Sequence, residues 1–122
     1  MDYEIVGFGN SMLDITVNVN DEFLEKNDLT KGNFSLINDE KSKLLHDQII
    51  DLDTKESPGG SVSNTVAGAA LLGAKAAYIG GLGNDELGKI YKEKNLAVGV
   101  CDLFLKQENT STGECIACIT PD

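Results

Sequence analysis

The run of small residues from position 58 to 73, PGGSVSNTVAGAALLG, constrains the fold of this chain more than any other segment. Its apolar residues recur at helical spacing, and its final glycine suits the position just past a helix end. Gly59 and Gly60 come directly before the first turn of that helix, where backbone amides have no partner within the helix. The segment therefore predicts a glycine turn followed by a helix with an open N-terminus.

Two interpretations of this turn and helix remain open on the segment alone. In the first, an oxygen-rich ligand approaches the amides at Gly60, with Ser61 and the amide side chain of Asn64 beside it on the first helical turn. In the second, Gly68 and its neighbouring alanines only allow close packing of the helix on a sheet, and the glycine turn is an ordinary loop. The first interpretation requires polar partners elsewhere in the chain.

Such partners follow the first predicted strand. Residues 3–9 form a short apolar run closed by Gly-Phe-Gly, which is typical of a buried parallel strand, and residues 13–19 alternate like a strand with one wet face. Asn10 and Asp14 come after the carboxyl end of the first strand, where α/β sheets bind their ligands. A carboxylate there can accept two hydrogen bonds from a diol. Taken separately, Asn10 in a turn and Asp14 on a solvated face would be equally ordinary.

The rest of the chain predicts three further helices and four extended segments. Helices are expected over residues 21–27, 39–51 and 86–98, and extended segments over 32–37, 75–80, 100–106 and 114–120. Asp21 and Asp39 are the expected N-caps of the first two helices, and Asn84 or Asp85 caps the third. Tyr91 faces inward from the third helix. This order of elements indicates an α/β layer with a small β-excursion.

Charge and cysteine content exclude several classes of partner. The net charge is −10 with 10 Lys and Arg residues and no basic stripe, which argues against nucleic acid and anionic membranes. No apolar stretch is long enough to span a bilayer, and the N-terminus lacks the features of a signal peptide. Three cysteines without a secretory signal fit a reducing compartment, so a cytoplasmic location is expected.

Four tempting motifs fail on chemical grounds. Met12 stands where a dinucleotide-binding GxGxxG needs its third glycine, and Ile90 replaces the hydroxyl that a P-loop uses for Mg²⁺. Cys115 and Cys118 are three residues apart on an expected strand, so their sulfurs point to opposite faces. His46 is the single histidine, which leaves histidine-based catalysis or zinc binding without support.

Three segments together resemble the N-terminal portion of a PfkB-type, ribokinase-like carbohydrate and nucleoside kinase: GFGNSMLDI, PGGSVSNTVAGAALLGAKAAYIGGLGNDELGKIY and STGECIACITPD. The segment NDEFLEKNDLTKGNFSLINDEK resembles the adenosine-kinase-like branch. The resemblance implies an α/β fold in which a parallel sheet is flanked by helices and carries a small β-sheet lid. Residues 1–122 would then be the N-terminal part of one kinase domain, with lid segments at about 12–20, 32–38 and 100–122.

The resemblance also implies roles for individual residues. Those that would bind the hydroxyl groups of a sugar or nucleoside are Asn10, Asp14, Gly59, Gly60, Ser61 and Asn64. Those that would supply apolar contacts from the lid are Met12, Phe34, Ile116 and Cys118.

By the same resemblance, the parent protein would transfer the γ-phosphoryl group of ATP to a primary hydroxyl, with Mg²⁺ as cofactor. The family's Gly-Ala-Gly-Asp turn, which carries the catalytic aspartate, and its Asn-x-x-Glu motif are expected beyond residue 122. No catalytic residue or metal ligand is therefore assigned here, and the 122 residues alone are expected to be inactive. The alternative is a non-catalytic sugar- or nucleoside-binding module, or a homodimer formed through the lid, whose free strand edges invite pairing.

Overall fold

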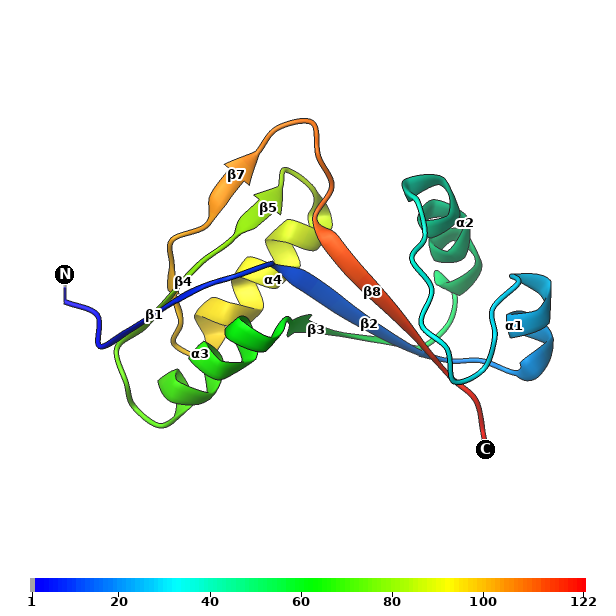
Figure 1. Cartoon of the computed structure of the whole chain (residues 1–122), viewed down its shortest axis with the longest axis horizontal. Helices are drawn as coiled ribbons and strands as arrows, with labels where there is room; N and C mark the ends of the chain where they lie inside the picture. The colour runs from blue at the N-terminus through cyan, green and yellow to red at the C-terminus, as the bar shows by residue number, and fades with distance from the viewer. Residues whose placement is uncertain (1) are drawn as a thin grey trace. The chain divides into compact units, whose positions relative to one another are not determined.

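The computed structural model describes residues 2–122, which form an α/β arrangement of four helices and eight short strands (Figure 1). The helices are α1 (Asp21–Lys26), α2 (Asp39–Ile49), α3 (Ser61–Leu71) and α4 (Glu86–Ala97). The strands are β1 (Ile5–Phe8), β2 (Met12–Asn18), β3 (Thr54–Gly59), β4 (Ala76–Ile79), β5 (Gly81–Gly83), β6 (Cys101–Asp102), β7 (Leu105–Gln107) and β8 (Gly113–Ile119). None of the helices in this described part is long and apolar enough to cross a bilayer.

The chain divides into two compact units, each of which is described separately below. The first consists of residues up to Asp14 together with Glu56–Cys115, and the second of Ile15–Lys55 together with Ile116–Asp122. The chain passes between the units within β2, β3 and β8, which form a three-stranded sheet in the order β3-β2-β8.

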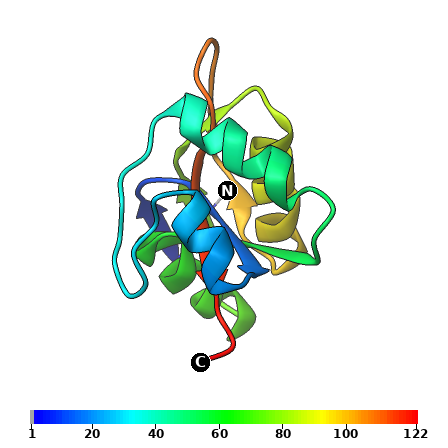
Figure 2. The same ribbon diagram turned by 90° about the vertical axis from the view of Figure 1, so that its right-hand side faces the viewer.

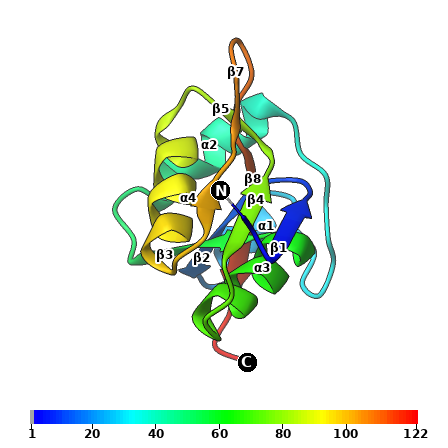
Figure 3. The same ribbon diagram turned by 90° about the vertical axis from the view of Figure 1, so that its left-hand side faces the viewer.

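A parallel sheet in the order β1-β4-β6 is the centre of the first unit. In Figure 3, β1 and β4 run side by side and point the same way. Helix α3 packs on β1 and β4, because Gly7 leaves room for the side chains of Val62 and Val66; a Cβ at Gly7 would lie 2.8 Å from Val62 Cγ1. A small residue of the strand, Gly7 in β1, therefore lets α3 approach the sheet closely.

Three aromatic rings fill the space between this sheet and α4. The ring centroids of Tyr78 and Tyr91 are 6.4 Å apart, and Phe104 packs edge-on to both at 5.7 Å. Tyr78 and Tyr91 are completely buried. Burying each such ring contributes roughly 1.5–3 kcal/mol to folding, so this cluster fixes α4 against β4. The inward orientation predicted for Tyr91 is confirmed.

The second unit contains helices α1 and α2, drawn in blue and teal in Figure 2. Its buried apolar side chains include Ile15, Val17, Leu24, Leu45 and Ile49. A reciprocal amide pair joins the two helices, since Gln48 Nε2 donates to Asn27 Oδ1 at 2.9 Å and Asn27 Nδ2 donates to Gln48 Oε1 at 3.1 Å.

Several predicted elements need correction. Residues 32–37 contain no strand, and the expected strand over 100–106 is interrupted to give β6 and β7. Asp21 and Asp39 are not the N-caps of α1 and α2, because the asparagine before each accepts the capping hydrogen bond instead. Strand β3 was not predicted, since Pro58 and Gly59 at its end are typical of a loop.

Candidate functional site

The glycine turn between β3 and α3 adopts a backbone conformation that demands glycine. Gly60 has a φ angle of 96° and is the N-cap of α3. Its position offers no side-chain cap to the helix, so the first amides of α3 receive no side-chain cap hydrogen bond there. Ser61 and Asn64 lie exposed on this first turn. The backbone N–H of Asn64 donates to the carbonyl oxygen of Gly60 at 3.0 Å. The predicted turn and helix are confirmed.

Asp14 and Asn10, the two polar residues predicted after the first strand, both contact this turn. A Cβ built on Gly59 would lie 2.6 Å from the Cγ of Asp14, so the carboxylate packs directly on the glycine backbone. A Cβ built on Gly60 would lie 2.7 Å from the carbonyl oxygen of Asn10. The structure thus brings together four of the predicted site residues, which come from segments more than forty residues apart in the sequence.

This arrangement can bind a polyhydroxylated molecule. The Asp14 carboxylate offers several acceptor positions, the first amides of α3 offer donors, and the Asn64 side chain offers both. Because Asp14 is half-buried, its hydrogen bonds to hydroxyl groups would compete with less water than on an open surface.

Cys115 lies near the Asp14 carboxylate but is not an activated nucleophile. Partial burial and, to a smaller extent, the negative charge of Asp14 raise the pKa of the Cys115 thiol, which stays protonated at neutral pH. Cys101, Cys115 and Cys118 are all free thiols.

A buried polar chain behind the turn was missed by the sequence analysis. Tyr91 Oη donates to the carbonyl oxygen of Gly59 at 3.2 Å, Asn95 Nδ2 donates to Tyr91 O at 3.0 Å, and Ser63 Oγ donates to Asn95 Oδ1 at 3.4 Å. The available signal was the inward position of Tyr91, because a buried tyrosine hydroxyl usually finds a partner.

A second missed cluster connects α4 with the start of β8. Asp85 caps α4 by accepting from the Gly88 amide at 2.8 Å, and it also accepts from the amide and hydroxyl of Thr112 at 2.7 and 2.6 Å. The Thr112 hydroxyl in turn accepts from the Gly83 amide at 3.0 Å. Partial burial alone would raise the pKa of Asp85, but the hydrogen bonds from Thr112 and Gly88 outweigh burial and hold it below its ordinary value.

The predicted lid residues are divided between the two units. Met12 belongs to the first unit and is partly exposed, whereas Phe34, Ile116 and Cys118 belong to the second. Phe34 is 81% exposed. Their contacts with substrate stay a prediction.

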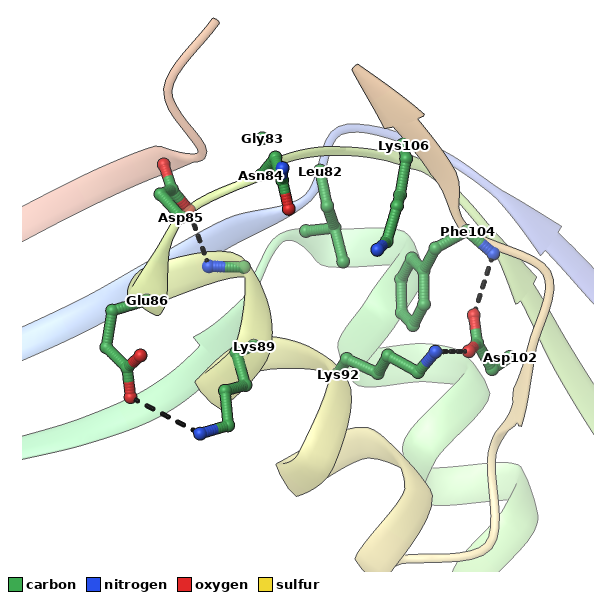
Figure 4. Close-up of a pocket in the computed structure, with 11 residues that line it drawn as sticks. Leu82, Gly83, Asn84, Asp85, Glu86, Lys89, Lys92, Asp102, Phe104 and Lys106 are labelled. Atoms are coloured by element: carbon green, nitrogen blue, oxygen red, sulfur yellow. Dashed lines mark hydrogen bonds and ion pairs between the residues drawn. The ribbon is translucent and has the colours of Figure 1, made fainter. Parts of the chain in front are cut away.

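A pocket of about 640 Å³ lies elsewhere in the first unit, beside the N-terminal turns of α4 (Figure 4). Most of the charged side chains that line it are paired with each other. Lys92 forms an ion pair with Asp102, and Lys89 Nζ lies 3.9 Å from Glu86 Oε1. None of the site residues predicted from the sequence lines it. We therefore place the candidate site at the glycine turn.

Comparison with known proteins supports the resemblance drawn from the sequence. The family model described as pfkB family carbohydrate kinase matches residues 33–122. The chain belongs to this kinase family. An adenosine kinase from Saccharomyces cerevisiae is 34% identical over 123 aligned positions, which include 95% of this chain and 36% of the relative. The chain thus spans about a third of the length of such relatives.

Solved structures of similar proteins confirm the ribokinase-like α/β fold of this pfkB kinase chain. The adenosine kinase from Sinorhizobium meliloti has a TM-score of 0.76 and 35% identity, with 98% of this chain and 36% of that one covered. The adenosine kinase from Schistosoma mansoni in complex with adenosine has a TM-score of 0.77 and 28% identity, with 94% and 35% covered. These similarities agree with the adenosine-kinase-like branch indicated by the sequence.

Proposed function

We propose that the whole protein transfers the γ-phosphoryl group of ATP to the primary hydroxyl of a nucleoside or sugar, with adenosine as the first candidate. The observation that carries this proposal is the contact of the Asp14 carboxylate with Gly59, at the turn that opens α3. The similarity to adenosine kinases, one of them in complex with adenosine, supports the choice of nucleoside.

In the proposed complex, the sugar ring lies against the glycine turn. Asp14 accepts hydrogen bonds from two ring hydroxyls, while Asn64 and the first amides of α3 bind the same ring from the helix side. These contacts hold the ring so that its primary hydroxyl is directed at the γ-phosphate. In phosphoryl transfer, such positioning supplies a large part of the rate enhancement.

The chemical step needs groups that we do not assign to residues 2–122. The hydroxyl oxygen forms a bond to the γ-phosphorus as the bond between that phosphorus and the β–γ bridging oxygen breaks, and a carboxylate base accepts the hydroxyl proton. Within the described residues, no three His, Cys, Asp or Glu side chains gather in a way that could hold a metal ion. We assign neither the base nor a Mg²⁺ ligand to these residues, although the family implies use of both ATP and Mg²⁺.

The decisive experiment combines the whole protein with ATP, Mg²⁺ and a panel of nucleosides and sugars, and measures phosphorylated product. Asp14→Asn should lower kcat/KM for the preferred substrate by about tenfold to a hundredfold, because it replaces charged hydrogen bonds with neutral ones. Asp47→Asn, on the exposed side of α2, is the matched control and should have no effect.

Other outcomes would point to the alternative functions. Binding of a ribosyl ligand without any phosphorylation would indicate that the protein is a non-catalytic binding module and not a kinase. Concentration-dependent association without ligand binding, measured by sedimentation, would favour the dimerisation module instead.

A further inference from the structure

Tyr91 joins helix α4 to the glycine turn by a side-chain hydrogen bond. Its hydroxyl donates to the carbonyl oxygen of Gly59, the residue against which the Asp14 carboxylate packs. Both partners are buried, so the bond forms away from water. Tyr91 does not lie in the turn itself; it reaches the turn from α4.

The same helix also binds the other side of the turn. Asn95, one helical turn after Tyr91, accepts from the hydroxyl of Ser63 at 3.4 Å and donates to the Tyr91 carbonyl. Ser63 and Asn95 are each 1% exposed. Helix α4 is therefore joined by hydrogen bonds to the residue before Gly60 and to the first turn of α3 after it.

This attachment selects one orientation of the peptide between Gly59 and Gly60. A trans peptide holds its C=O and N–H on opposite sides, so a carbonyl fixed by Tyr91 directs the Gly60 N–H away from α4. Glycine has access to more backbone dihedral angles than any other residue, so a peptide between two glycines rotates easily unless a hydrogen bond holds it. Without the tyrosine hydroxyl, this peptide would lose the bond that fixes the direction of the Gly59 carbonyl and, with it, the direction of the Gly60 N–H.

We propose that Tyr91 is a positioning residue of the substrate site, holding the Gly59–Gly60 peptide in the orientation that binds a hydroxylated ring. This inference rests on the proposed function and extends it to a residue that does not contact the substrate. Ser63 and Asn95 complete the same attachment.

Tyr78 provides a matched control from the same aromatic cluster. It is buried as completely as Tyr91, and its ring packs on the same Phe104. Its hydroxyl, however, lies near those of Ser11 and Tyr91 and makes no hydrogen bond to Gly59 or Gly60. Removing the oxygen from either tyrosine leaves a phenylalanine of nearly the same volume, and only one of the two changes removes a bond to the turn.

The test measures adenosine binding by calorimetry, and unfolding by urea, for the whole protein and its Tyr91→Phe and Tyr78→Phe variants. If adenosine is not the ligand, the substrate identified by the phosphorylation panel replaces it. Tyr91→Phe should raise Kd, and KM with it, by about three- to tenfold, the range expected for one lost hydrogen bond. Tyr78→Phe should leave Kd unchanged. Ser63→Ala, which removes the other attachment, should raise Kd in the same direction by a smaller factor.

The outcomes separate this inference from the proposed function. If the unsubstituted protein binds no member of the panel, both are overturned. If it binds and Tyr91→Phe binds equally well, only the inference is overturned, even where the urea midpoint of that variant falls. An equal loss of affinity in Tyr78→Phe would also overturn it, because the effect would then come from packing of the aromatic cluster.

Discussion

At the scale of single residues, the candidate site depends on glycines whose missing side chains have measurable consequences. Gly60 and Gly73 both have positive φ angles, 96° and 99°, and both flank α3. They differ in surroundings, because a Cβ at Gly60 would lie 2.7 Å from Asn10 O, whereas a Cβ at Gly73 would meet nothing within 4 Å. The two positions therefore separate backbone strain from collision.

Gly60→Ala should destabilise the protein by about 2 kcal/mol or more, since an L-residue at φ 96° and ψ 133° is strained by roughly 1–3 kcal/mol and the collision with Asn10 O adds to it. Gly73→Ala should cost only the strain. Urea unfolding of both variants measures the difference. Only Gly60→Ala should weaken adenosine binding. If the Gly60→Ala and Gly73→Ala variants bound adenosine with equal affinity, the placement of the site at this turn would be wrong.

At the scale of elements, the sequence predicted best those segments in which local and tertiary preferences agree. The alternation of Leu13, Ile15 and Val17 predicted β2, and all three are buried. The failures come from tertiary context. A strand such as β5, three residues long, exists only because β7 pairs with it, and no local pattern reports a pairing partner more than twenty residues away.

The candidate site shows the same division. Asp14, Asn10 and the glycine turn could be predicted, because strand ends and helix starts have local signatures. The contact of Tyr91 with Gly59 could not, since it depends on how α4 packs on the turn. One of the two open interpretations of α3 also fails in part, because a Cβ at Gly68 would meet nothing within 4 Å. Close packing does not require that glycine.

Gly68→Ala should consequently stabilise the protein, by about 0.5–1 kcal/mol, because alanine is the better helix former and the space is open. Gly88 in α4 is the matched control. A Cβ there would lie 2.6 Å from Gly83 O, so Gly88→Ala should destabilise instead. Chemical denaturation of both variants checks the signs, and a destabilising Gly68→Ala would mean that another surface packs against α3.

The cluster of Asp85 and Thr112 should make stability depend on pH in acid. The pKa of Asp85 is lowered in the folded protein from a value near 3.8, so its contribution is complete above that value and is lost as pH falls through the folded pKa. The difference in urea midpoint between the unsubstituted protein and Asp85→Asn should therefore shrink below about pH 4.

Two variants of Thr112 test the cause of this pH dependence. Thr112→Ser keeps the hydroxyl that donates to Asp85 and should preserve the acid effect, whereas Thr112→Val removes it and should weaken the effect. Because that hydroxyl is buried and makes two hydrogen bonds, Thr112→Val should also cost about 1–3 kcal/mol at neutral pH. Identical pH profiles for the two variants would show that another group titrates.

At the scale of the whole molecule, charge is the dominant feature. The chain carries 20 acidic and 10 basic residues, and the ion pair of Lys31 with Asp122 is on the surface, where such pairs contribute little. Repulsion among the excess carboxylates therefore opposes folding more than exposed pairs support it. Salt screens this repulsion over a distance of about 10 Å at 0.1 M.

Raising NaCl from about 20 to 300 mM should accordingly raise the unfolding temperature of the 122-residue chain by a few degrees, because the screening length falls severalfold over that range. A neutral osmolyte of equal osmolality controls for solute exclusion. Glu108→Lys, at an exposed turn, brings the net charge of −10 two units closer to zero and should make the salt dependence shallower. A melting temperature that falls with added NaCl would instead mean that favourable ion pairs outweigh the repulsion.

Adenosine is uncharged at neutral pH, so its Kd should stay constant across the same salt series, which separates effects on folding from effects on the site.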